Sequence, residues 1–264
     1  MSELKSFDRV AHVYDETRAM PPEVTARVAD AIACAAREVA ALPRLLEVGI
    51  GTGRVAVPLA ERGVRVSGAD IAPKMLGVLR AKRADIPVLL AEATRLPFRD
   101  GAFDAALFVH VLHLVPDVDG VLREAVRVVH PGGAIIYGGD DHPAGIRREA
   151  DAIVWECARE AGVDMGTRDA PHHRAMEAMS GGVLRDAGAR LETIEAARWT
   201  GRVSVRQMLE RLARRDYSSS WRIPEEKVAG IVEAARPRLE ALLGGPDGEA
   251  PFERSFSLIV ARLP

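Results

Sequence analysis

A glycine-rich turn joins a short apolar run to an amphipathic stretch in the first quarter of the chain. Residues 45–56 read LLEVGIGTGRVA, with three glycines between the apolar run and the next helical pattern. Glycine permits a tight turn and lets a ligand approach the backbone closely. In open α/β sheets, ligands bind beyond the carboxyl ends of the strands. The segment therefore predicts a strand, a ligand-binding turn and a helix, in that order.

The same alternation of apolar strand and helix continues along the chain. Strands that are apolar on both faces need helices on both sides of the sheet, which crossover connections supply. The sequence thus predicts a doubly wound, Rossmann-like α/β fold with a mostly parallel sheet of seven strands. The expected strands are residues 44–49, 64–70, 88–93, 103–110, 134–138, 190–198 and 254–262.

The alternation of strands and helices stops after Asp140, where strand signals weaken and helical patterns dominate. We therefore expect an N-terminal helical segment over 1–40, an α/β core over 41–140 and a helical cap inserted at 141–189 that faces the substrate. Residues 190–264 would complete the core, with a helical insertion at 204–243 and a loop at 244–251.

Composition excludes several classes of protein. The formal net charge is −2 and the pI is about 6.4, so no global basic field favours nucleic acid or an anionic membrane. The two cysteines, Cys34 and Cys157, lack metal-ligand spacing and do not suggest a disulfide framework. The chain shows neither a signal peptide nor a membrane-spanning run. We expect a cytoplasmic protein without a metal site.

Acidic residues follow three neighbouring strands and identify the kind of ligand. Glu47 precedes the glycines, Asp70 ends the second predicted strand, and Glu92 lies near the end of the third. The glycines from Gly51 fit the dinucleotide pattern G-x-G-x-x-A. However, three carboxylates would repel a pyrophosphate. They suit a cationic, phosphate-free nucleoside such as S-adenosylmethionine (SAM), which carries a sulfonium and an ammonium.

Four stretches together resemble a known family. They read LLEVGIGTGRVA, VSGADIAPKML, AEATRLPFRDGAFDAALFVHVLHLVPD and LREAVRVVHPGGAIIYG. In this order the chain resembles the class I SAM-dependent methyltransferases of the ubiquinone/menaquinone C-methyltransferase-like group (methyltransferase domain type 11). The resemblance implies methylation of a small molecule, with S-adenosylhomocysteine (SAH) as product. It also implies an antiparallel last strand, over 254–262, between the fifth and sixth.

The resemblance further implies a set of cofactor contacts. Glu47 and the glycine backbone would hold the methionine portion, and Asp70 would accept hydrogen bonds from the ribose. Glu92 stands where the family more often has Asp. Tyr14 and Arg18 lie in a segment that folds over the cofactor as a lid in similar enzymes. The implied contacts are Tyr14, Arg18, Glu47, Gly49, Ile50, Gly51, Gly53, Asp70, Ile71, Met75, Glu92, Ala93, Thr94, Phe108, Val109 and His110.

A general base assists methyl transfer when the acceptor still carries its proton. His110 and His113 follow the fourth predicted strand, and Asp141 follows the fifth, so all three are candidates. Three other functions stay open: a nucleotide-cofactor oxidoreductase, an RNA-modifying methyltransferase and a non-catalytic SAM-binding module. The acidic pI and the missing N/D-P-P-Y/F motif speak against nucleic acid. The acceptor, the methylated atom and the choice between monomer and homodimer are left undetermined.

Overall fold

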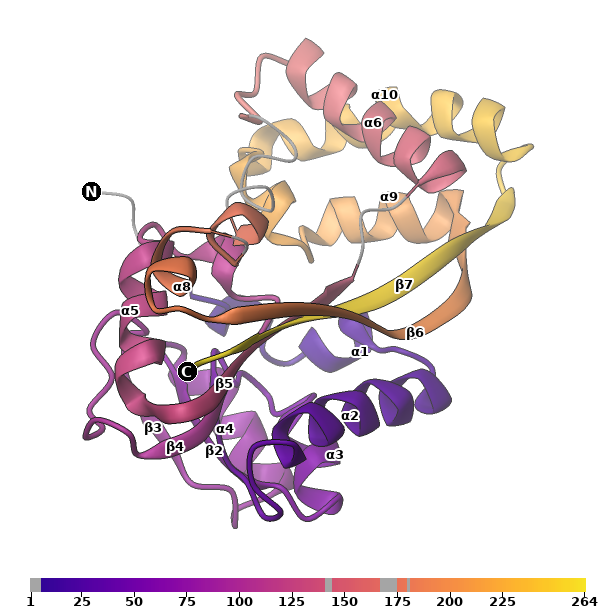
Figure 1. Ribbon diagram of the computed structural model, residues 1–264. Helices are drawn as coiled ribbons and strands as arrows, with labels where there is room; N and C mark the ends of the chain where they lie inside the picture. Colours follow the sequence, from indigo (N-terminus) through magenta and orange to yellow (C-terminus); the bar gives the residue numbers. More distant parts are fainter. Residues whose placement is uncertain (1–5, 141–143, 167–174, 180) are drawn as a thin grey trace. The chain divides into compact units, whose positions relative to one another are not determined.

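A seven-stranded sheet organises the chain (Figure 1). The computed structural model describes residues 6–140, 144–166, 175–179 and 181–264. The strand order is β3-β2-β1-β4-β5-β7-β6. The strands are β1 (Arg44–Val48), β2 (Arg65–Asp70), β3 (Val88–Leu90), β4 (Phe103–Val109), β5 (Val129–Asp140), β6 (Arg190–Ser204) and β7 (Glu249–Arg262).

The first five strands are parallel, and β7 enters the sheet in the opposite direction. β1 pairs with β2 on one side and β4 on the other, so their carboxyl ends meet at one edge. β7 pairs antiparallel with β5 from Ala134↔Arg262 to Asp140↔Phe256. This confirms the predicted seven-stranded fold with an antiparallel last strand between the fifth and sixth.

Helices cover both faces of the sheet, which explains why every residue of β4 is buried. Figure 1 shows α2 and α3 on one side and α5 and α8 on the other. The short N-terminal elements are η1 (Asp8–Val10) and α1 (Tyr14–Arg18). The other elements around the sheet are α2 (Pro22–Arg37), α3 (Ala56–Glu61), α4 (Pro73–Lys82), η2 (Leu112–Leu114), α5 (Val118–Val128) and α8 (Gly182–Asp186).

Element ends follow local chemistry. Pro22 and Pro73 open α2 and α4, where a missing N–H costs nothing. The Asp117 side chain caps α5 by accepting the N–H of Gly120 at 2.8 Å. The helix after the glycine turn begins at Ala56, since the turn glycines before it have left-handed φ angles.

Two compact units make up the chain. The first holds the described residues up to Asp140, those within 169–197, and Phe256–Pro264. The second holds those within 141–168 and 198–255.

The second unit has its own apolar core, formed by helices and the outer parts of β6 and β7. Its helices are α6 (Gly145–Glu160), α9 (Val205–Arg214), η3 (Ser218–Arg222) and α10 (Glu225–Leu243), and α10 packs against α6 and α9. The predicted loop over 244–251 is wrong at its end, where Glu249–Pro251 already belong to β7. Among the described helices, none combines the length and apolar character that crossing a membrane requires.

Candidate functional site

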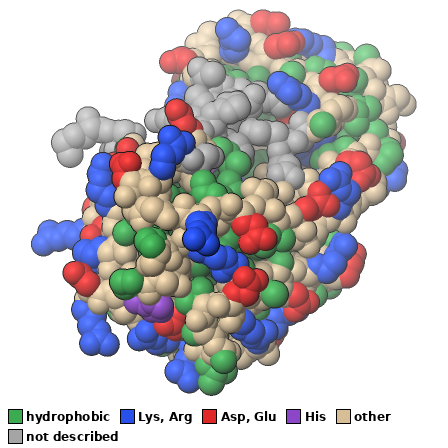
Figure 2. All heavy atoms as spheres, viewed as in Figure 1, with side chains coloured by type: hydrophobic (Ala, Val, Ile, Leu, Met, Phe, Trp, Pro, Cys, Tyr) green, Lys and Arg blue, Asp and Glu red, His purple; other side chains and the backbone are tan. Residues whose placement is uncertain are grey.

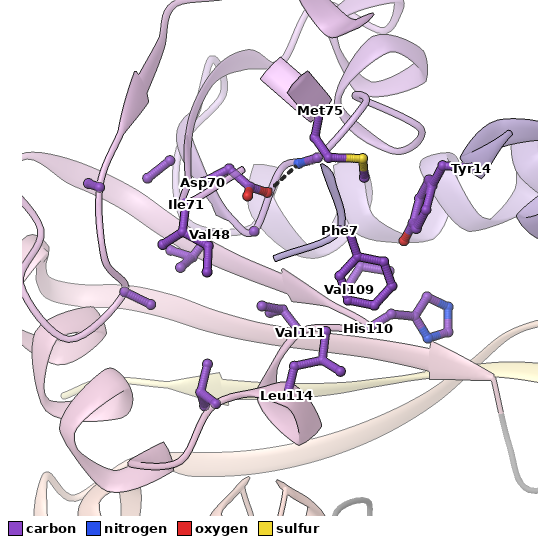
Figure 3. Close-up of a pocket in the computed structure, with 16 residues that line it drawn as sticks. Phe7, Tyr14, Val48, Asp70, Ile71, Met75, Val109, His110, Val111 and Leu114 are labelled. Atoms are coloured by element: carbon purple, nitrogen blue, oxygen red, sulfur yellow. Dashed lines mark hydrogen bonds between the residues drawn. The ribbon is translucent and has the colours of Figure 1, made fainter. Parts of the chain in front are cut away.

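A pocket of about 730 Å³, part of it open to solvent, lies at the carboxyl edge of the sheet in the first unit. Figure 3 shows Asp70, Ile71 and Val48 at one end and Phe7, Tyr14 and His110 at the other. The remaining lining residues are Gly49, Gly51, Ala69, Met75, Ala91, Ala93, Val109, Val111, Leu114 and Val115. The pocket is therefore built where the strand order predicts a ligand.

The glycine turn after β1 is shaped by conformations that other residues rarely adopt. Gly49, Gly51 and Gly53 have φ angles of 76°, 55° and 76°. A Cβ on Gly53 would lie 2.3 Å from Cδ1 of Leu79, and one on Gly49 would lie 2.6 Å from Cγ2 of Val111. The turn therefore needs glycine for backbone angle and for space.

Asp70 connects the end of β2 to this turn. Its Oδ2 accepts the N–H of Gly51 and its Oδ1 accepts the N–H of Ala72, both at 2.8 Å. Burial raises the pKa of Asp70, while the backbone hydrogen bonds from Ala72, Gly51 and Ile71 act against that rise. The carboxyl group is thus a pocket-lining acceptor that the backbone holds in place.

Glu47 is a buried acid with incomplete hydrogen bonding. Its residue is 3% exposed, and its Oε2 accepts no hydrogen bond from any residue that the structure describes. Burial raises the pKa of Glu47 to about 8, with a smaller rise from Asp70 and an opposing effect of Arg54. An unsatisfied buried carboxyl is costly, so a cation beside it would be a favourable partner.

The N-terminal segment, residues 6–18, brings two rings to the pocket. Phe7 and Tyr14 pack edge to face with centroids 5.8 Å apart, and both line the pocket. Polar contacts attach the segment to the core. Asp8 accepts the N–H of Lys74 at 2.8 Å, and Asp15 accepts the hydroxyl of Thr52 at 2.6 Å.

Two further contacts reinforce this attachment near the glycine turn. The Lys82 ammonium pairs with Asp15 and donates to the carbonyl of Thr52 at 2.9 Å. Arg54 donates to the carbonyl of Arg18 at 3.2 Å. The N-terminal segment, which contributes Phe7 and Tyr14 to the pocket lining, is therefore attached to α4 and to residues at the glycine turn.

His110 follows β4 directly and lines the pocket. Its φ of 56° is left-handed, a conformation that costs about 1–3 kcal/mol in a non-glycine residue and is concentrated at functional sites. His113 lies in η2 and is not among the residues that line the pocket. Asp141, the third candidate base, lies outside the described residues.

The structure brings most of the predicted cofactor contacts to this pocket, but not all. Glu92 and Thr94 are exposed and do not line it; Ala91 and Ala93 line it instead, because β3 ends at Leu90. Phe108 is fully buried in the core of the sheet. Ile50 and Gly53 belong to the turn and Arg18 accepts a hydrogen bond from Arg54, but none of the three lines the pocket. Glu47 is buried just before the turn and does not line the pocket either.

Sequence reasoning missed several residues of the pocket. Phe7, Val111, Leu114 and Val115 line it but were not among the predicted contacts. The last three fall within the stretch AEATRLPFRDGAFDAALFVHVLHLVPD, whereas the one signal for Phe7 was an aromatic residue in an otherwise polar N-terminal stretch. Among the described residues, no group of three or more His, Cys, Asp or Glu is arranged to hold a metal ion.

Comparison with known proteins gives the same assignment as the motifs. Residues 46–137 match the family model described as a methyltransferase domain. The demethylmenaquinone methyltransferase of Tropheryma whipplei is 36% identical over 141 residues, which are 53% of this chain and 59% of the relative. That of Thermus thermophilus is 40% identical over 99 residues, 35% of this chain and 45% of the relative.

The chain thus spans less than two thirds of the curated relatives it matches. Among solved structures, a SAM-dependent methyltransferase from Thermotoga maritima aligns with a TM-score of 0.50 at 20% identity, covering 98% of each chain. At that identity the likeness shows the fold. The predicted resemblance is confirmed: residues 46–137 match a methyltransferase-domain model, and the chain is similar to demethylmenaquinone methyltransferases over about half its length.

Proposed function

We propose that this protein transfers a methyl group from SAM to a small-molecule acceptor. The observation that carries the proposal is the pairing of a buried, incompletely bonded Glu47 with a pocket-lining Asp70 around a glycine turn. Together these groups suit a ligand with a cationic end and a ribose. The largely apolar remainder of the lining suits an adenine ring.

Different residues of this chain would bind different parts of SAM. Asp70 would accept hydrogen bonds from the ribose hydroxyls, and Ile71 and Met75 would pack against the adenine. The backbone of the glycine turn would hold the methionine portion, with Glu47 as the counter-charge for its ammonium. The ligand supplies an activated methyl group on sulfur when it is bound.

The protein's own contribution to transfer is alignment and exclusion of water. The N-terminal segment would support this role because Phe7 and Tyr14 lie at the same end of the pocket as His110 (Figure 3). His110 would receive the proton of an acceptor that still carries one. Similarity to demethylmenaquinone methyltransferases makes a quinol the first acceptor to test.

Charge distribution favours a small molecule over RNA. On the face shown in Figure 2, acidic and basic side chains are interspersed, and the formal net charge is −2. A nucleic-acid interface requires a basic patch or stripe. The same carboxyls that favour SAM disfavour a phosphate-bearing dinucleotide.

Isothermal titration calorimetry with SAM, SAH, NAD⁺ and NADPH tests the proposal directly. We expect SAM and SAH to bind with one site per chain and neither dinucleotide to bind. Transfer of radioactive methyl from SAM to a panel of quinols, phenols and amines then identifies the acceptor. Dinucleotide binding without SAM binding would overturn the proposal.

A further inference from the structure

The backbone at His110 is held in its left-handed conformation by β5. The N–H of His110 donates to the carbonyl oxygen of Gly138 at 3.3 Å. His110 and Arg215 are the two non-glycine residues with positive φ in the described part of the chain. Its neighbours Val109 and Val111 line the pocket with it. His110 therefore brings an imidazole to a part of the pocket lining whose neighbouring residues are apolar.

A ring from the far end of the chain supports that imidazole. Phe256 of β7 meets His110 edge to face, with ring centroids 5.9 Å apart and an interplanar angle of 84°, a favourable geometry for two rings. Phe256 is fully buried and pairs with Asp140 in the β5–β7 ladder. The antiparallel insertion of β7 beside β5 brings this ring into contact with His110.

Gly138 provides the space that Phe256 occupies. A Cβ on Gly138 would lie 2.9 Å from Cε1 and 3.0 Å from Cζ of Phe256, closer than real Cβ atoms normally approach a neighbour. Gly138 has an ordinary backbone angle, since it is absent from the residues with positive φ. Glycine is therefore required here for space, so that one residue both accepts the His110 N–H and leaves room for the ring.

We propose that Phe256, seated over Gly138, is a positioning residue that aims the His110 imidazole at the methyl acceptor. The inference rests on the proposed function. In the step it serves, the acceptor's O–H or N–H bond breaks and the proton passes to a ring nitrogen of the His110 imidazole. The acceptor's electron pair forms the new bond to the methyl carbon, and the carbon–sulfur pair returns to sulfur, leaving a neutral thioether.

Two variants disturb the contact between Phe256 and His110 in different ways. F256L removes the ring, while G138A keeps it but forces it to move. F103L is the matched control, because Phe103 is also a buried phenylalanine and packs edge to face with Phe98 at 4.8 Å. Phe103 lies at the opposite end of β4 and pairs with Val129, next to His130.

The readout is the ¹H–¹³C spectrum of the histidine rings, with the His110 signal assigned by its loss in H110Q. We expect F256L and G138A each to shift the His110 signal, and F103L to shift His130 while leaving His110 in place. With an acceptor identified for the wild type, F256L should lower kcat by about tenfold, part of the roughly 10²- to 10⁴-fold that a positioned base supplies. KM for the acceptor and the affinity for SAH should stay unchanged.

The outcomes separate this inference from the function on which it rests. If the wild type binds SAM but neither F256L nor G138A moves the His110 signal, the positioning role is wrong and the proposed function stands. If F256L does not fold, G138A decides the question alone. If the wild type binds no SAM, the proposed function fails, and with it any role of His110 in methyl transfer.

Discussion

The N–H of Gly51 donates a hydrogen bond to Oδ2 of Asp70 at 2.8 Å, which joins the glycine turn after β1 to the end of β2. The second oxygen of Asp70 holds the first turn of α4 through Ala72. The Asp70 carboxyl group thus connects β2, the glycine turn and the start of α4, and it also lines the pocket. Its removal should affect ligand binding and local order together.

We predict that D70A weakens SAM binding by about tenfold to a hundredfold, because each hydrogen bond to a charged group contributes about 1.5–3 kcal/mol. The control is D85A, which removes an exposed carboxylate that pairs with Arg83; exposed pairs contribute little. Calorimetric titration of both variants with SAM provides the comparison. Equal affinities for the two variants would show that the site is misplaced.

Gly51 is predicted to be intolerant of a side chain. G51V would place a branched residue at a φ of 55° with its Cβ 3.2 Å from Cε of Met75, whereas G63V at a φ of 77° would meet nothing within 4 Å. Each variant should lose about 1–2 kcal/mol of stability from backbone strain. Only G51V should also lose SAM binding, and retained binding by G51V would contradict the assignment of the turn.

Glu47 should make the unfolding free energy depend on pH. Its pKa is raised from 4.5 to about 8 in the folded protein, so the unfolded state releases its proton first as the pH rises. The folded state then keeps a proton that the unfolded state has lost, and stability falls between pH 4.5 and about 8 by up to about 1.4 kcal/mol per pH unit. Below pH 4.5 both states are protonated and this effect vanishes.

E47Q should remove this contribution. Urea unfolding of both proteins at pH 5 and pH 8 measures it as the difference between wild type and E47Q, which cancels the other titrating groups. We expect E47Q to gain stability relative to the wild type as the pH rises. A difference that does not change with pH would show that Glu47 is ionised in the folded state.

Binding of a cation beside Glu47 should release a proton. A nearby positive charge favours the ionised carboxylate, so SAM binding at pH 7 should displace the proton that burial retains. Titrations in buffers of different ionisation enthalpy measure the number of protons released. We expect a clear fraction of a proton for the wild type and none from this group for E47Q.

The N-terminal segment should control how fast the ligand leaves. D15N keeps the size of the side chain but removes the charge that pairs with Lys82, and it weakens the acceptor of the Thr52 hydroxyl. Since the Asp15 side chain is 40% exposed, the loss should be about 1 kcal/mol, or about fivefold in the dissociation rate of SAH. The control is D30N, which weakens the exposed pair between Asp30 and Arg62. Stopped-flow measurement gives the SAH dissociation rate of both variants. An equal rise of this rate in both would contradict a specific role of the N-terminal segment.

Local patterns predicted the parallel half of the fold well. The glycine turn, Asp70 and the alternation of strands and helices are short-range signals, and each lies where the structure needs it. Side-chain placement at the ends of strands was harder to predict. Glu92 was expected to line the pocket. Whether the side chain of a residue after a strand points toward the pocket depends on where that strand ends. β3 ends at Leu90, after three residues, and Glu92 is exposed.

Long-range packing explains most of what the sequence did not reveal. Nothing near Phe256 marks it as a neighbour of His110, since the contact exists only after β7 has inserted beside β5. Similarly, the left-handed backbone of His110 could not be read from its residue type, because positive φ angles are uncommon in any residue other than glycine. These relationships become visible when the register of β7 against β5 is known.

All residues that line the pocket come from the first 115 positions, between Phe7 and Val115. The described residues after that point belong to the remaining elements of the first unit or to the second unit. The residues that line the pocket are therefore encoded in a stretch of sequence separate from the second unit. Substitutions in the second unit leave every one of these lining residues unchanged.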